Sequence, residues 1–249
     1  MIPFFRKIRY RLAKDNQFFK YSRYAIGEIG LVVIGILIAL QINQWNDYRI
    51  KRNLEVEFLK EIKDNLLKDK AQIDQILIFN KKKEATIQNT MYSFEKARTD
   101  AFDLSEFSQH MGVLGSYNDF HPNRTAFDNL LDTESVSLIT NKNLRTLLSK
   151  YYKFNFMSGT QETVRDRTRV FVETASSHLT TKESVNRMFG VNLDLKSSTN
   201  TQIQKDENII TSMVYMSIVM SYQNELMNNT VADVNLILEL IQAHIEEKK

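Results

Sequence analysis

The chain has 249 residues, enough for a membrane anchor and one soluble domain with its own core, and its seven glycines and two prolines are too few for an all-β fold. The absence of cysteine excludes disulfide frameworks, thiolate metal sites and cysteine nucleophiles. The formal charge of +3 is uneven, because residues 1–23 carry seven basic side chains and one acidic side chain.

Residues 24–43 are predicted to form a transmembrane helix after a basic cytoplasmic segment, residues 1–23. Residues 25–42 read AIGEIGLVVIGILIALQI, which spans about 27 Å as a helix, close to the hydrocarbon thickness of a bilayer. Aromatic residues that favour head-group levels flank this run: Tyr21, Tyr24, Trp45 and Tyr48. A short basic N-terminus tends to stay inside. We therefore expect a single-pass signal anchor in the inner membrane, with a cytoplasmic N-terminus and a periplasmic domain.

One face of the predicted span combines a carboxylate with small residues. Glu28, Gly35 and Ala39 share this face, and the Gly35–Ala39 spacing allows close approach of a second helix. Glu28 has three interpretations: it reaches the membrane interface, it takes part in helix packing, or it moves protons. We favour the first, and we expect the face itself to be the membrane contact surface.

Residues 44–98 are predicted to form a long stalk-like helix, either as one element or as two in tandem. Apolar residues keep helical spacing at Leu59, Ile62, Leu66, Ile73 and Ile76. The basic run 81–83 could bind phosphate or lipid, but a solvated helix face is the simpler interpretation.

Residues 99–249 are predicted to form a helical bundle domain that packs with the preceding helix. Thr140 is a plausible N-cap for a helix that continues past Gly159. The pattern from Thr180 to Glu183 is typical of a capping box, and Gly190 is expected to close that short helix.

The strongest periodicity lies near the C-terminus and has the spacing of a coiled coil. Apolar residues recur every three or four positions. The expected helix-packing residues are Met213, Met216, Met220, Met227, Val231, Val234, Leu238 and Ile241. The methionines at 213–220 could form an adaptable partner groove, but a bundle core is the preferred interpretation, because methionine fills irregular gaps.

Common catalytic signatures are absent from the sequence. There is no Gly-rich phosphate loop, His-Glu-x-x-His helix, Gly-x-Ser-x-Gly elbow or calcium loop. The four histidines do not share a spacing that would bring two of them together on one helix face. Asp119 and His121 lie close in a turn, where ordinary hydrogen bonding is a simpler role than catalysis. We therefore expect neither an enzyme nor a metal or cofactor site.

Residues 4–47 read FFRKIRYRLAKDNQFFKYSRYAIGEIGLVVIGILIALQINQWND. This stretch closely resembles the start of an uncharacterised Bacteroidota family of membrane-anchored helical proteins, a domain of unknown function. A weaker resemblance runs through residues 120–125 and 137–145 to residue 152. The resemblance implies a bacterial inner-membrane protein with a helical extracytoplasmic region, and it implies no reaction.

The sequence as a whole predicts an all-α fold in which one N-terminal transmembrane helix precedes long amphipathic helices in an elongated helical bundle. The leading hypothesis is a non-enzymatic interaction or scaffold module whose partners are the lipid bilayer and either further copies of itself or another membrane protein. The alternatives are a sensor of an envelope ligand and an accessory subunit of a membrane transporter that acts through a partner. Nucleic acid is not an expected partner, because the basic tail adjoins an apolar segment.

Overall fold

The computed structural model of the protein describes residues 17–97, 102, 104–133 and 135–247, and most of these residues are helical. Within these ranges there are seven α-helices and three short 3-10 helices, and no strand. The predicted all-α class is confirmed. The chain divides into two compact units, Met1–Val56 and Glu57–Lys249.

The helices differ greatly in length. The α-helices are α2 (Gln17–Lys96), α3 (Leu104–Leu114), α4 (Thr125–Asp132), α5 (Lys142–Lys153), α6 (Thr160–Leu179), α7 (Lys182–Phe189) and α8 (Glu207–Glu246). The 3-10 helices are η1 (Ser135–Leu138), η2 (Ser198–Asn200) and η3 (Ile203–Lys205).

Helix α2 is one unbroken element, so the predicted segment 44–98 is a single continuous helix as far as Lys96. Its continuity follows from composition, because no glycine or proline occurs between Gly35 and Gly112. The N-terminal part of α2 belongs to the first compact unit, and the part from Glu57 onward belongs to the second.

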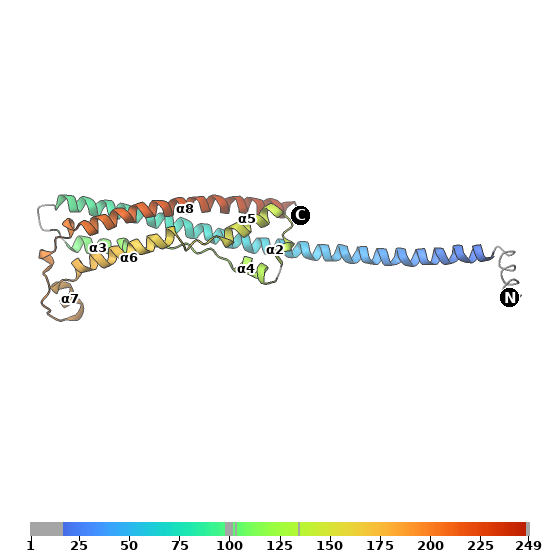
Figure 1. Cartoon of the computed structure of the whole chain (residues 1–249), viewed down its shortest axis with the longest axis horizontal. Coiled ribbons are helices and arrows are strands. Elements are labelled where there is room, and N and C mark those ends of the chain that lie inside the picture. Colours follow the sequence, from blue (N-terminus) through green and yellow to red (C-terminus); the bar gives the residue numbers. More distant parts are fainter. Residues whose placement is uncertain (1–16, 98–101, 103, 134, 248–249) are drawn as a thin grey trace, which may run out of the picture. The chain divides into compact units, whose positions relative to one another are not determined.

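In the second unit, α2 and α8 run antiparallel, side by side (Figure 1). Side-chain hydrogen bonds fix their register: Lys63 Nζ donates to Gln242 Oε1 at 2.8 Å, and Lys70 Nζ donates to Asn235 Oδ1 at 2.9 Å. Further along, Asn80 Nδ2 lies 2.8 Å from the side-chain oxygens of both Gln223 and Asn224. Lower sequence numbers on α2 therefore pair with higher numbers on α8.

The buried face of α8 differs from the expected one at two positions. The buried residues are Ile209, Met213, Met216, Val219, Met220, Gln223, Met227, Thr230, Val234, Ile237, Ile241, His244 and Ile245. Val231 and Leu238 are only half-buried, and the neighbouring Thr230 and Ile237 take the buried positions. Gln223, Thr230 and Ile237 follow one another at seven-residue spacing and therefore lie on the same face of α8. The buried face thus includes polar residues. Met213, Met216 and Met220 belong to the core and do not form an exposed groove.

Helices α5 and α6 pack along α8, and α3 packs on α6. The core joins buried apolar residues of α2, α3, α6, η3 and α8 with Phe102, which lies just before α3. Its members are Ile87, Phe94, Phe102, Phe107, Leu114, Phe171, Ala175, Ile203, Ile209, Met213, Met216 and Met220. The five apolar residues predicted for α2, from Leu59 to Ile76, are buried as well. A second aromatic group lies between α4, α5 and the segment before α6. In it, Phe127 stacks on Tyr152 with 4.6 Å between the two ring centroids.

The helix ends correct three predictions. The N-cap of α5 is Asn141, whose side chain accepts from Leu144 N, and not Thr140. The helix does not continue past Gly159, because α5 ends at Lys153 and Gly159 adopts φ +74° before α6 begins. The capping box of α7 pairs Thr181 with Ser184, one residue later than predicted, whereas the closing role of Gly190, at φ 69°, is confirmed.

We expect Phe171→Ala to lower the free energy of unfolding by about 3–5 kcal/mol, because it removes a fully buried ring and leaves a cavity in the core. Phe189→Ala is the matched control, since that ring is 70% exposed, and we expect it to change stability by less than about 0.5 kcal/mol. Urea unfolding of the full chain in detergent measures both. Equal effects of the two substitutions would contradict the described core.

Candidate functional site

The apolar part of α2 is exposed. An 18-residue window of this helix has a mean hydropathy of 2.3, and none of the window is buried. The helix is therefore long and apolar enough to cross a membrane. Glu28, Gly35 and Ala39 are all exposed on it, and no other side chain lies within 4 Å of where a Cβ on Gly35 would stand. Within the described ranges, the helix face that carries Glu28, Gly35 and Ala39 is therefore exposed and could contact a helix of another chain.

Two of the four expected aromatic anchors are visible at the end of this apolar run. Trp45 and Tyr48 are exposed, and the guanidinium groups of Arg49 and Arg52 lie 5.6 and 5.4 Å from their respective ring centroids. Such aromatic and cationic side chains together suit a head-group environment. The side chains of Tyr21 and Tyr24, and residues 1–16 of the basic segment, lie outside the described residues.

The preferred interpretation of the basic run 81–83 is wrong for Lys83. Its side chain is buried, with 1% exposure. Lys83 Nζ donates to Ser116 O at 2.7 Å and to Thr168 Oγ1 at 3.0 Å. Burial lowers the pKa of Lys83 from 10.5 to about 8, because the charged ammonium loses its water shell. A buried cation held by two neutral oxygens is a structural group, since a surface phosphate cannot reach it.

Lys83 belongs to a set of polar side chains that hold one non-helical segment inside the bundle. Residues 116–124, here called the connecting segment, link α3 to α4 without regular structure. Five side chains from α2, α6 and α8, here called the polar clamp, bond to its backbone: Gln72, Lys83, Asp69, Gln161 and Gln223. Buried backbone groups need such partners when no helix or strand supplies them. The clamp therefore replaces secondary structure along this segment.

Gln161 and Asp69 each join the connecting segment to a second part of the fold. Gln161 is fully buried, accepts from Phe120 N, and donates to Phe120 O at 3.2 Å and Phe156 O at 2.6 Å. Asp69 accepts from Asn123 N at 2.7 Å and from the Tyr151 hydroxyl at 2.8 Å. Burial raises the pKa of Asp69, and these two hydrogen bonds oppose that shift. Both carboxylate oxygens thus fix neighbouring parts of the fold.

The acid–base side chains that the structure describes are spread over several separate places. Asp119 and His121 line one shallow, open hollow, and burial raises the pKa of Asp119 against the opposing charges of Arg165 and His121. The other histidines have separate partners: His110 contacts Thr90, His178 contacts Asp206, and His244 contacts Thr140. Within the described ranges, no three His, Asp or Glu side chains are grouped as metal ligands.

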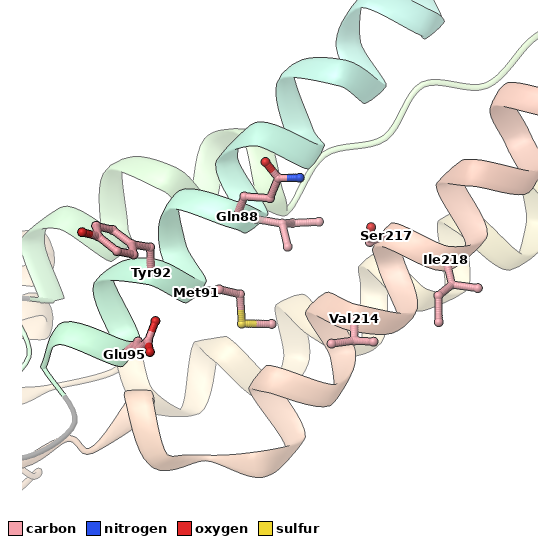
Figure 2. A pocket seen from close by; sticks show the side chains of 8 residues that line it. Gln88, Met91, Tyr92, Glu95, Val214, Ser217 and Ile218 are labelled. Carbon is pink, nitrogen blue, oxygen red and sulfur yellow. The ribbon is translucent and has the colours of Figure 1, made fainter.

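An apolar groove lies between α2 and α8 (Figure 2). This α2–α8 groove has a volume of about 480 Å³. Its lining residues are Ile87, Gln88, Met91, Tyr92, Glu95, Val214, Ser217 and Ile218. Tyr92, Val214 and Ile218 are exposed large apolar side chains along it. The groove can accept an apolar ridge with a few polar contacts at its edges.

Sequence reasoning missed both the polar clamp and the groove. A usable signal for the clamp was present, because Asp69 and Lys83 each lie four residues before an apolar residue of α2, Ile73 and Ile87. The groove had no comparable signal. Its two walls are more than one hundred residues apart in the sequence, and helical spacing alone does not show which exposed faces adjoin.

A family model described as a family of unknown function (DUF6090) matches residues 28–159. The match covers most of the apolar run of α2, the clamp residues of α2, the connecting segment and α3 to α5. No curated protein and no solved structure matches the chain.

We expect Lys83→Met to remove a pH dependence of stability between about pH 8 and 10.5. In this interval the unfolded lysine holds a proton that the folded one has released, so the wild-type protein gains stability as pH rises. The gain is roughly 3 kcal/mol, and below pH 8 both states are protonated and this dependence vanishes. Urea unfolding of the wild-type protein and the variant at pH 7 and pH 10.5 gives the difference between their free energies of unfolding at each pH. We expect this difference to change between the two pH values. If the difference in unfolding free energy is the same at both pH values, Lys83 Nζ is hydrated in the folded protein.

We expect Gln161→Leu to destabilise the bundle by about 3 kcal/mol, because three buried backbone groups lose their partner. Hydrogen exchange at the Phe120 amide should accelerate in parallel. Gln75→Leu provides the control, since Gln75 is exposed on α2 and should leave both readouts unchanged. Slow exchange at Phe120 in Gln161→Leu would show that the clamp does not hold the connecting segment.

Proposed function

The chain belongs to this family of unknown function, since the match spans more than half of its length, and we propose that it is a membrane-anchored, non-enzymatic interaction module. The observation that carries the proposal is the α2–α8 groove, where Tyr92, Val214 and Ile218 leave large apolar surfaces exposed. Exposed apolar side chains that line one open groove between two helices are a surface to which a protein partner could bind.

The proposed setting is the inner membrane of a bacterium of the Bacteroidota, with the N-terminus in the cytoplasm and the bundle in the periplasm. The basic residues of 1–23 support this orientation, because positive charge is retained on the cytoplasmic side. Trp45 and Tyr48 support an interface at the end of the apolar run.

The proposed partner is a helix of another protein anchored in the same membrane, either a different chain or a second copy. An amphipathic helix fits an apolar groove by placing residues at three- and four-residue spacing into it. The groove is open, which favours a protein over a small ligand, because ligand sites usually bury most of the ligand surface. The exposed Gly35 and Ala39 would allow the same partner to approach inside the bilayer.

We expect Ile218→Asp to reduce the yield of partner cross-links in native membranes at least tenfold, because a carboxylate would be desolvated in the occupied groove. Leu236→Asp is the matched control. Leu236 lies on the same helix and is 45% exposed, against 43% for Ile218, but it does not line the groove. Mass spectrometry of the cross-linked chains identifies the partner and quantifies the loss.

Equal losses in both aspartate variants, or unchanged yields in both, would refute a contact through the groove. Gly35→Leu separates the membrane contribution, since its side chain blocks close helix approach without altering the groove. A partner lost in Gly35→Leu alone would assign recognition to the membrane span. Recovery of the wild-type protein as a lone monomer would contradict the interaction module itself.

A further inference from the structure

Helix α7 lies at one end of the bundle (Figure 1). This helix and the residues after it expose large apolar side chains. None of the residues of α7 is buried. Met188 is 74% exposed, Phe189 70%, Val191 44% and Leu193 54%. These four side chains, here called the apolar tip, fall within six consecutive positions and contribute little to the core.

The exposure of the apolar tip is not caused by a loose chain. Helix α7 begins with the capping box and ends at Gly190, and beyond it Asn186 Nδ2 donates to Asn192 Oδ1 at 2.6 Å. The Glu183 carboxylate accepts from Ser197 Oγ at 2.7 Å and from Ser198 N at 2.9 Å. These bonds close residues 182–198 into a fixed loop that presents its apolar side chains outward.

The loop that carries the tip has a small excess of basic charge. Lys182, Arg187 and Lys196 are exposed, and Asp194 is an exposed acidic residue of this loop. The contacts with Ser197 and Ser198 lower the pKa of the other carboxylate, Glu183, and keep it charged, so three cations and two anions leave a net charge of +1. Apolar side chains with flanking cations match the boundary between the head groups and acyl chains of an anionic bilayer.

The size of the tip also distinguishes a lipid surface from a protein. A stable protein interface needs roughly 800 Å² and 20–30 residues from each partner, and four side chains on one short loop fall well below that. Shallow insertion into lipid has no such minimum, because each buried apolar side chain adds to the binding on its own.

We propose that the apolar tip is a membrane-contact site that inserts Met188 and Phe189 into the surface of an anionic lipid bilayer. The site is separate from the apolar run of α2 and from the α2–α8 groove. It gives the bundle a lipid contact of its own, in addition to the anchor.

The test uses the full chain held in phosphatidylcholine nanodiscs and measures its co-flotation with added vesicles. We expect binding to vesicles that contain phosphatidylglycerol, weaker binding to pure phosphatidylcholine, and a decrease with added salt. The double substitution Met188→Ser with Phe189→Ser should weaken binding at least tenfold. Arg187→Gln should weaken binding to the anionic vesicles about fivefold.

Ile78→Ser is the control, because Ile78 is 70% exposed but lies on α2, away from the tip; this variant should bind like the wild-type protein. Equal thermal unfolding of all variants shows that the fold is kept. Unchanged binding of the double variant, equal binding to both kinds of vesicle, or no binding by the wild-type protein would each overturn the proposal. Association of the nanodiscs with one another through the tip, without vesicles, would also overturn it by identifying a second copy as the occupant.

Discussion

The bundle depends on the hydrogen bonding of polar side chains that occupy core positions of α2. Asp69, Asn80 and Lys83 follow the same helical face as the buried isoleucines around them, so the helix cannot pack without enclosing them. Each is costly to bury alone, because an unpaired polar group loses its hydration. The connecting segment supplies the missing partners for Asp69 and Lys83, and α8 supplies them for Asn80. The polar residues and the irregular segment therefore require each other.

The same dependence explains which parts of the fold could be predicted from the sequence. Helix α2 was predictable because glycine and proline are absent and Leu59 to Ile76 keep helical spacing. The spacing of apolar residues alone predicted that Lys83 is exposed to solvent. On α8 it predicted that Val231, and not Thr230, belongs to the buried face. Both errors have one physical cause, since a polar residue is treated as exposed until its partner is known. Cap positions shifted by one residue where two suitable residues, Thr140 and Asn141, are adjacent.

The candidate sites were predictable to different degrees for a related reason. A membrane-crossing run depends only on local composition, so residues 25–42 identify it without any tertiary information. The α2–α8 groove depends on which faces of two distant helices adjoin, and that follows from contacts such as Lys70 with Asn235. The apolar tip was less predictable than the membrane-crossing run and more predictable than the groove. Its residues are contiguous, but only the burial pattern shows that Met188 and Phe189 face away from the core.

The fixed pairing of α2 with α8 constrains how this chain can change in length. One residue added to α2 between Leu59 and Asn80 would turn the remainder of the helix by about 100°. Lys83 would then leave the connecting segment, and every later core position would rotate with it. Additions of seven residues nearly restore the face but move Asn80 away from Gln223. Relatives of this protein should therefore keep the spacing within the paired helices.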